Sequence, residues 1–82
     1  MSYFVYILLC RDGTYYTGSS NDIEKRFNDH LMGHGARYTK SHKPVKIIYQ
    51  EEFSTKSEAL KREIKIKKMT KTQKVLLLTR IS

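Results

Sequence analysis

Glu63 stands out among the charged residues because it falls on the apolar side of a predicted helix. At about 100° per residue, one face of that helix collects four apolar side chains, and Glu63 projects into the middle of this face. These side chains are Ala59, Leu60, Ile64 and Ile66. A carboxylate that points toward a core needs a cation, a hydrogen-bond network or a metal ion. Glu63 is therefore either a metal ligand or the ion-pair partner of a lysine such as Lys67 at position i+4, and the spacing leaves both open.

Arg26 and His30 form a second chemically capable pair, one helical turn apart at positions i and i+4. They flank an apolar stripe that consists of Ile23, Phe27 and Leu31. A guanidinium matches the oxygens of a phosphate, and an imidazole beside it can hydrogen-bond or accept a proton. The alternative is a solvent-exposed flank in which Arg26 extends over the sheet.

Tyr6 and Tyr16 supply two phenols from neighbouring predicted strands. Asp12-Gly13 lies between them and is a strong signal for a hairpin turn, so both phenols belong to one short sheet. Whether they share a face depends on the strand register, which the sequence leaves undetermined. Packing of both rings in a core is the simple alternative, because tyrosine is a common strand residue.

Three strands are predicted to position these groups. Tyr3–Cys10 is rich in β-branched and aromatic residues, which is typical of a strand covered on both faces. Thr14–Thr17 is its predicted antiparallel partner and ends at Gly18, and Val45–Tyr49 is the third strand. The single cysteine, Cys10, ends the first apolar run, so we expect a buried thiol and neither an intramolecular disulfide nor a cysteine-based zinc cluster.

Three helices are predicted from capping boxes, in which a short polar residue is followed three positions later by Glu or Gln. The pairs are Asn21 with Glu24, Thr55 with Glu58, and Thr70 with Gln73. The first helix is expected to end near Leu31, where Met32–Gly35 stops it. The second is expected to reach about Lys68, and the third carries Val75–Leu78. Ala36–Pro44 is polar and basic and is predicted to be a loop. The order β-β-α-β-α-α predicts an α+β fold, a small three-stranded antiparallel sheet flanked by helices.

The composition indicates one domain, residues 1–82, with a polyanion as its partner. Lysine and arginine number 16 against 8 aspartate and glutamate, which gives a net charge of +8. Such a field favours nucleic acid, because neutralised phosphates release counterions; a merely solubilising surface is the alternative. A chain this short predicts a shallow groove or surface site. The apolar run Phe4–Cys10 is too short to span a membrane and lacks the features of a signal peptide, so a cytoplasmic protein without membrane contact is expected.

The residues singled out above, taken in order, resemble the GIY-YIG nuclease family. They are Tyr6, Tyr16, Arg26, His30 and Glu63. The two tripeptides of the family motif appear as Phe4-Val5-Tyr6 and Tyr16-Thr17-Gly18, and Arg26 follows Tyr16 at the same spacing of ten residues that separates the two tyrosines. The chain is also similar to the small stand-alone branch of that family grouped as UPF0213. The similar segments are Tyr3–Cys10, Asp12–Gly18, Gly35–Thr39 and Ser57–Glu63.

The match to the family motif departs at several positions, and the late asparagine of some repair nucleases is not evident. Phe4 stands in place of the first glycine, and Thr17 stands in place of isoleucine. Ser19 occupies a position where some relatives carry a lysine. The first two changes suit strand positions, whereas the third bears on how substrate would be held.

The resemblance implies a metal-dependent endonuclease that hydrolyses phosphodiester bonds, with DNA as the expected substrate and DNA repair or processing as the expected role. Glu63 would be the only direct protein ligand of one Mg²⁺ or Mn²⁺ ion, which suits an ion that keeps several waters. Arg26 would bind the scissile phosphate. Tyr6 or Tyr16 would orient or deprotonate the attacking water, with Tyr6 favoured as the base. His30 would support the water or the tyrosine by hydrogen bonding.

A nucleic-acid surface is expected around this site. Gly18 would bring backbone close to the substrate, and Tyr38 would stack on a base. Phosphates that flank the scissile bond would contact Arg37, Lys40, Lys43, Lys61 and Lys65. A non-catalytic nucleic-acid-binding module on the same fold is one alternative. A second is an interaction protein that docks Val75–Leu78 on a partner helix, although this segment can equally complete the core, and no obligate protein partner is expected.

Overall fold

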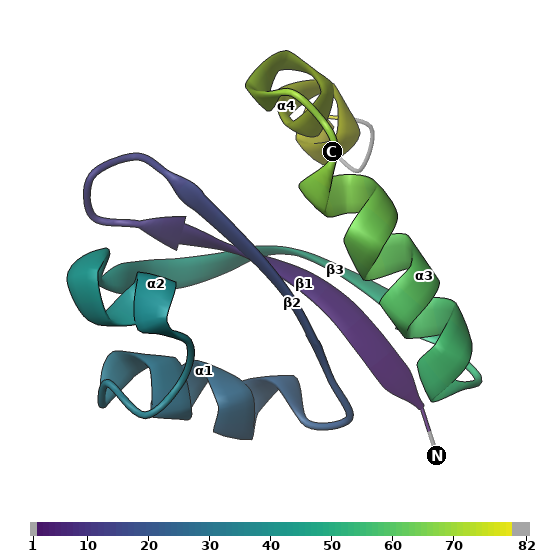
Figure 1. Ribbon diagram of the computed structural model, residues 1–82, viewed down its shortest axis with the longest axis horizontal. Helices are drawn as coiled ribbons and strands as arrows, with labels where there is room; N and C mark the ends of the chain where they lie inside the picture. Colours follow the sequence, from purple (N-terminus) through teal and green to yellow (C-terminus); the bar gives the residue numbers. More distant parts are fainter. Residues whose placement is uncertain (1, 80–82) are drawn as a thin grey trace.

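The computed structural model describes residues 2–79, which form a three-stranded antiparallel sheet with four helices around it (Figure 1). The strands are β1 (Tyr3–Cys10), β2 (Tyr15–Ser20) and β3 (Pro44–Phe53), in the spatial order β2-β1-β3. The helices are α1 (Ile23–Leu31), α2 (Arg37–Ser41), α3 (Lys56–Lys67) and α4 (Lys71–Thr79). The predicted α+β class and three-stranded antiparallel sheet are confirmed. No helix within the described residues is long and apolar enough to cross a membrane.

The central strand β1 divides the core into two layers, because successive side chains of a strand point to opposite faces. Val5 and Ile7 pack on one face with residues of α3 and α4, whereas Tyr6 and Leu8 pack on the other with residues of α1. All four of these side chains are at most 1% exposed. The prediction that this strand is covered on both faces is confirmed, and Cys10 is buried as predicted.

The β1–β2 hairpin turns through Asp12-Gly13 as predicted. Gly13 has a φ of +83°, a conformation that glycine adopts without a steric penalty, and the Asp12 carboxylate accepts a hydrogen bond from the backbone N–H of Thr14. The expectation that the second strand ends at Gly18 is wrong, because β2 continues to Ser20 and pairs with β1 over that whole length. Gly18 therefore lies inside a strand, directly opposite Tyr6.

The segment between α1 and β3 differs most from the prediction. Residues 37–41 form the short helix α2 where a loop was expected, so the element order is β-β-α-α-β-α-α. No side chain caps its N-terminus, and the helix is held instead through its own residue Thr39, whose side chain is fully buried. Such a tertiary anchor leaves no capping signal in the sequence.

The start of α1 and the end of β3 also differ from the predicted boundaries. The N-cap of α1 is Asp22, whose carboxylate accepts from the backbone N–H of Lys25, so the predicted capping box at Asn21 and Glu24 is wrong by one position. Strand β3 runs on from Tyr49 to Phe53 through residues with low strand propensity, because pairing with β1 satisfies its backbone. The hydroxyl caps at Thr55 and Thr70 were predicted and are confirmed.

The buried face of α3 is rotated from the predicted one. Ala59 and Ile66 are fully buried, but Leu60 and Ile64 are 41% and 55% exposed, so their assignment to the core is wrong. Arg62 takes part of their place and donates two hydrogen bonds to the Glu51 carboxylate of β3. The part-buried ion pair between α3 and β3 thus takes a position that hydrophobic periodicity assigned to apolar side chains.

The predicted apolar residues of α1 and α4 are confirmed in part. In α1, Ile23 is buried and Phe27 packs beside it, whereas Leu31 is 42% exposed, contrary to the prediction. In α4, Leu77 and Leu78 pack against the core, and the other two residues of the predicted apolar run, Val75 and Leu76, are exposed.

Candidate active site

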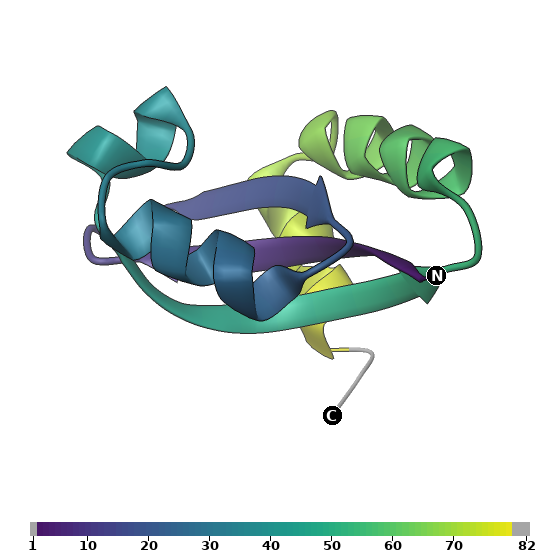
Figure 2. The ribbon, with the colours of Figure 1, turned by 90° about the horizontal axis from the view of Figure 1, so that it is seen from below.

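The Tyr6 ring crosses β2 at Gly18. A Cβ atom added at Gly18 would lie 2.5 Å from the Tyr6 hydroxyl oxygen and 2.7 Å from Cζ, so the ring occupies the space that any other side chain would fill. The ring is 1% exposed. Gly18 therefore admits the phenol toward the outer edge of the sheet, the β2 edge, which α2 and α3 both approach (Figure 2). This role differs from the expected contact between Gly18 backbone and substrate.

His30 meets Tyr6 from α1. The two side chains share a hydrogen bond of 3.0 Å between the Tyr6 hydroxyl and His30 Nε2, and His30 is completely buried. Sequence reasoning placed His30 on a flank of the apolar stripe, yet the structure gives it the inward position that Leu31 was expected to take.

Tyr16 shares the face of Tyr6. The register pairs Tyr6 with Gly18 and Leu8 with Tyr16, which makes the two tyrosines diagonal neighbours on one side of the sheet. The Tyr16 ring lies 5.0 Å from the His30 ring at an interplanar angle of 59°. Tyr16 therefore contacts His30 through its ring, whereas Tyr6 contacts it both through its ring and through a hydrogen bond of its hydroxyl.

The charges of Arg26 and Glu63 both influence the Tyr6 hydroxyl. Burial raises the pKa of Tyr6 to about 12, with a further increase from Tyr16 and a smaller one from the Glu63 carboxylate. The Arg26 guanidinium opposes these effects through hydrogen bonding and positive charge, both of which lower the pKa. Four of the five predicted catalytic side chains thus act on Tyr6 or bond to it, and the fifth is Tyr6 itself.

The His30 pKa is shifted in the direction that keeps the ring neutral. Burial lowers it most, the charge of Arg26 lowers it further, and Asp29 partly opposes them. A neutral imidazole has one nitrogen that can accept a hydrogen bond. His30 is therefore able to accept from the Tyr6 hydroxyl near neutral pH.

Glu63 reaches the site from α3, on the side of the helix that faces the sheet. One carboxylate oxygen accepts a hydrogen bond of 2.5 Å from Ser19 of β2, and the other pairs with Lys67 at 2.7 Å. The i+4 ion pair that was left open as an alternative is therefore present. The Glu63 side chain is 15% exposed but that of Lys67 is 50% exposed, so the lysine is free to leave toward solvent.

Among the predicted catalytic residues, Arg26 carries the positive charge that is accessible to a substrate. Its one ion pair among the described residues joins it to Asp29 at 3.9 Å, and both side chains are more than a third exposed. Such exposed pairs contribute about 0–1 kcal/mol. The guanidinium can therefore exchange Asp29 for a phosphate at little cost.

The expected nucleic-acid contacts fall into two groups. Arg37, Tyr38 and Lys40 are exposed on α2, and Lys43 is exposed just before β3. Tyr38 stacks on His42 with the ring centroids 4.1 Å apart, so that face of Tyr38 is already covered. The second group, on α3, consists of Lys61 and Lys65 and is exposed as well.

The lysines of α3 lie on different faces of the helix. Lys61 and Lys65 each lie two positions from Glu63, which places them on nearly the opposite side of the helix. The lysine that meets the site is Lys67, and the hydroxyl that meets it is Ser19. The i+4 spacing indicated the contact of Lys67, whereas Ser19 was noted only as a departure from the family motif and its contact with Glu63 was not predicted.

The donor atoms near Tyr6 fit a metal ion that needs few protein ligands. No three His, Cys, Asp or Glu side chains gather to hold an ion anywhere in residues 2–79. Glu63 is the carboxylate at the site, and its two oxygens are engaged by groups that can yield, a hydroxyl and a half-exposed ammonium. Mg²⁺ keeps several waters and commonly takes one or two carboxylates together with substrate oxygens. The residues thus suit Mg²⁺ or Mn²⁺ and would not build a zinc site of several ligands.

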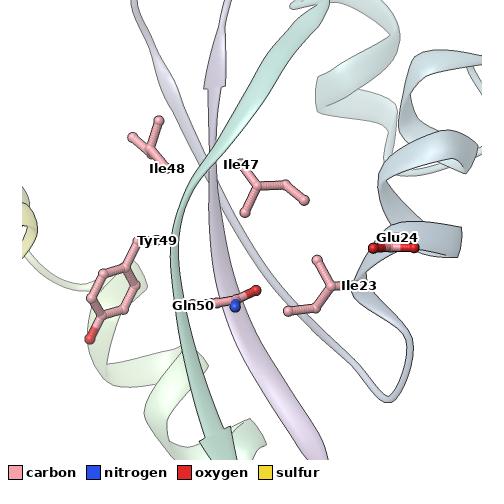
Figure 3. Close-up of a pocket in the computed structure, with 6 residues that line it drawn as sticks. All are labelled: Ile23, Glu24, Ile47, Ile48, Tyr49 and Gln50. Carbon is pink, nitrogen blue, oxygen red and sulfur yellow. The ribbon is translucent and has the colours of Figure 1, made fainter.

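The opposite edge of the sheet offers a hollow without this chemistry (Figure 3). It has a volume of about 450 Å³ and is lined by Ile23, Glu24, Ile47, Ile48, Tyr49 and Gln50. A register shift in β3 puts Ile48 and Tyr49 on one side of the strand, with Ile47 and Gln50 on the other. None of the predicted catalytic residues lines this hollow, so the candidate site is a surface at the β2 edge.

Comparison with known proteins gives consistent matches over most of the chain. A family model described as the GIY-YIG catalytic domain matches residues 2–75. UPF0213 proteins of Staphylococcus saprophyticus and Staphylococcus aureus are each 51% identical over 77 residues, which cover 94% of this chain and 94% of the relative. The solution structure of a UPF0213 protein of Bacillus halodurans superposes with a TM-score of 0.63 at 35% identity, covering 96% of this chain and 84% of that one. A solution structure from E. faecalis gives a TM-score of 0.66 at 39% identity, covering 99% and 86%.

Proposed function

Because the chain belongs to the GIY-YIG family, we propose that it is a metal-dependent endonuclease that hydrolyses phosphodiester bonds in DNA. The observation that carries the proposal is the environment of the Tyr6 hydroxyl. It is bonded to His30 at 3.0 Å, and the charges of Arg26 and Glu63 both act on it. A phenol joined to a proton acceptor, next to a guanidinium and a carboxylate, is a fitting arrangement for activating water beside a phosphate.

The proton route follows from the two shifted pKa values. With a pKa of about 12, Tyr6 is protonated at neutral pH, so it cannot take a proton from water unless it gives up its own. The lowered pKa of His30 keeps that ring neutral and ready to accept. Tyr6 therefore passes its hydroxyl proton to His30 Nε2 as it receives one from the attacking water. The oxygen of that water forms a bond to phosphorus, the bond from phosphorus to the leaving oxygen breaks, and the leaving oxygen takes a proton from solvent water.

Arg26 and Glu63 divide the remaining work. The Arg26 guanidinium binds the non-bridging oxygens of the scissile phosphate and stabilises the charge that grows on them. Glu63 holds the divalent ion, which when bound supplies positive charge to the phosphate and the leaving oxygen. For Glu63 to hold such an ion, Lys67 would have to leave the carboxylate, which its exposure permits.

The charge of the whole chain supports a polyanionic substrate. The net charge of +8 attracts nucleic acid over a distance of about 10 Å at moderate salt. The exposed cations of α2 lie beside the β2 edge, where they would hold phosphates that flank the scissile bond (Figure 2).

A non-catalytic nucleic-acid-binding module is the second candidate, and one observation favours it. Both oxygens of Glu63 are engaged within the protein, by Ser19 and Lys67. If this engagement persisted in the presence of metal, the surface would bind DNA without cutting it. Salt-sensitive binding without turnover would identify this case.

The test is a cleavage assay with purified protein, Mg²⁺ or Mn²⁺, and a panel of duplex, single-stranded and branched DNA with matching RNA. Glu63→Gln and Arg26→Ala are each expected to lower the rate at least about 100-fold, since each removes charge from the reacting centre. Both variants should keep the far-UV circular dichroism of the wild type.

Two matched controls remove the same kind of charge elsewhere. Glu24→Gln changes an exposed carboxylate of α1, and Arg11→Ala an exposed guanidinium of the hairpin turn. Both should cleave at close to the wild-type rate. Equal nicking by the wild type and by the Glu63 and Arg26 variants would reveal a contaminant and overturn the proposal, as would a wild type that binds DNA but never cuts it.

A further inference from the structure

The second ring nitrogen of His30 is held by a residue that has no assigned role. Thr39 of α2 lies with its hydroxyl oxygen 2.8 Å from His30 Nδ1, and both side chains are completely buried. The same hydroxyl lies 2.9 Å from the backbone carbonyl oxygen of Ala36. These contacts lie on the far side of the His30 ring from the Tyr6–His30 hydrogen bond, so they decide what His30 can do at its other nitrogen.

The direction of each hydrogen bond can be worked out from the number of hydrogens. A carbonyl oxygen only accepts, so the single hydroxyl hydrogen of Thr39 must point to Ala36. The 2.8 Å contact then needs a hydrogen from the other side, which places a proton on His30 Nδ1. In a neutral ring Nε2 is then bare, and it accepts the hydrogen of the Tyr6 hydroxyl.

One contact favours the opposite tautomer, but this contact is too long to determine the protonation of the ring. The backbone N–H of Ala36 points at His30 Nδ1 over 3.4 Å, compared with 2.8 Å for the Thr39 hydroxyl. A separation of 3.4 Å lies beyond the usual range for N–H donors, so this contact is weak. To satisfy it, Thr39 would have to turn its hydrogen from Ala36 to Nδ1 and leave a carbonyl without that bond.

The backbone beside Thr39 is shaped to the same ring. A Cβ atom added at Gly35 would lie 2.2 Å from His30 Nδ1 and 2.7 Å from Cε1 and Cγ. Only a residue without a side chain lets the chain pass this close. Gly35 and Thr39 thus hold the imidazole from the side opposite Tyr6. The short helix α2 presents Thr39, and Gly35 lies just before the N-cap of that helix.

We propose that Thr39 is a positioning residue that fixes His30 as the tautomer protonated at Nδ1, and thereby makes Tyr6 the tyrosine that passes its proton to His30. The second half of this inference depends on the proposed nuclease function, whereas the first half concerns the protein alone. It also separates the two phenols. Tyr16 meets His30 only through its ring, so its hydroxyl has no such proton acceptor among the contacts that His30 makes.

The first test reads the tautomer directly, by nitrogen-resolved NMR of the imidazole rings at neutral pH. The chain has three histidines, so assignment is simple. In the wild type His30 is expected to carry its proton on Nδ1. Thr39→Val keeps the side-chain shape but removes the hydroxyl, and it should shift His30 toward the other tautomer or a mixture. Thr39→Ser keeps the hydroxyl and should restore the wild-type pattern.

The second test measures kcat and KM for the same variants. Thr39→Val is expected to lower kcat by about 10- to 100-fold with KM little changed, as for other residues that orient a catalytic imidazole. Thr39→Ser should recover most of the rate. Thr72→Val, at an exposed position of α4, is the matched control and should behave as the wild type.

The outcomes separate this inference from the nuclease proposal. A wild-type His30 protonated at Nε2, or the same tautomer in the wild type and in Thr39→Val, overturns the role of Thr39 whether or not the protein cuts DNA. A wild type that never cleaves refutes the nuclease proposal, while the NMR result still decides the role of Thr39. If Thr39→Val fails to fold, Thr39→Ala, which also removes the hydroxyl, takes its place, and a wild-type ring protonated at Nε2 would by itself overturn the inference.

Discussion

The candidate site has two halves that are held in different ways. The buried half consists of Tyr6, His30 and Thr39, each at most 1% exposed and joined in one line of hydrogen bonds. The open half consists of Arg26, Glu63 and Lys67, whose side chains are 40%, 15% and 50% exposed. Glu63 forms an ion pair with Lys67, and Arg26 forms one with Asp29. The buried half has one arrangement that the fold determines. The open half can exchange its partners, which a site must do if metal and substrate are to enter.

This difference predicts that changes in the buried half alter stability and activity together, whereas changes in the open half alter activity alone. Interiors are packed closely enough that a single added methyl group displaces its neighbours. Exposed ion pairs contribute little to the free energy of unfolding and are screened by salt. A variant of the buried half that leaves stability unchanged, or a variant of the open half that lowers stability, would contradict this division.

The largest effect is expected from adding one methyl group to the buried half. Gly18→Ala would press on the Tyr6 hydroxyl, 2.5 Å from the new Cβ, and Gly35→Ala would press on the His30 ring at 2.2 Å. Each should lower the free energy of unfolding by about 1–3 kcal/mol and reduce cleavage about 100-fold, because the ring must move. Urea unfolding and initial rates measure the two effects.

Gly13 provides the control for these substitutions. Its φ is +83°, but a Cβ there would meet nothing within 4 Å. Asparagine tolerates that conformation, so Gly13→Asn should change stability and rate only slightly. Wild-type stability and rate in Gly18→Ala would show that the Tyr6 ring does not depend on that gap.

The buried half also predicts a loss of stability in mild acid. Unfolded His30 takes up a proton near its ordinary pKa of about 6.5, while the folded protein takes it up only at lower pH because burial and Arg26 depress the pKa. The unfolded state thus binds more protons below this point. The free energy of unfolding is fully retained above about pH 6.5 and falls as the pH drops toward the folded pKa, by at most about 1.4 kcal/mol per pH unit.

Urea titrations at several pH values between about 5 and 7.5 test this, a window in which ordinary carboxylates stay ionised. His30→Gln should flatten the dependence on pH, and His34→Asn, at an exposed position, should keep it. An unchanged slope in His30→Gln would mean that another group carries the effect.

The two halves also differed in how far the sequence could predict them. Glu63 was recognisable because a carboxylate on an apolar helix face is anomalous, and Lys67 because i+4 is a local spacing. The α+β class, the hairpin turn and the two hydroxyl caps were equally local and are confirmed. What local patterns specify was accessible from the residues alone.

The sequence named Tyr6 and His30 as candidates, but the contacts of the buried half join different elements, so local patterns did not reveal how these residues are held. Nothing in the residues around Thr39 announces a helix, because α2 exists through its anchor on His30, nine positions away. The inward position of His30 was likewise hidden, since hydrophobic periodicity assigns it to Leu31. Gly18 was read as a strand end, although it is a gap for the ring of a residue on the neighbouring strand.

The smallest effect is expected in the open half, from Lys67→Met. The Lys67 ammonium lies 2.7 Å from Glu63 and must leave before the carboxylate can bind a divalent ion. Removing it should lower the Mg²⁺ or Mn²⁺ concentration for half-maximal cleavage by about 3- to 10-fold, as expected for one partly screened charge. The free energy of unfolding should change by less than about 0.5 kcal/mol, because the lysine is half exposed.

Lys65→Met is the matched control for this prediction. Lys65 lies on the same helix two positions before Lys67 and two after Glu63, so it carries the same charge on the far side. Metal titrations of the two variants at constant ionic strength separate a local competitor from a general change in net charge. If both variants change the metal concentration for half-maximal cleavage equally, Lys67 does not compete with the metal ion for Glu63. If Lys67→Met instead destabilises the protein by more than about 1 kcal/mol, the pair belongs to the framework and the division into two halves fails.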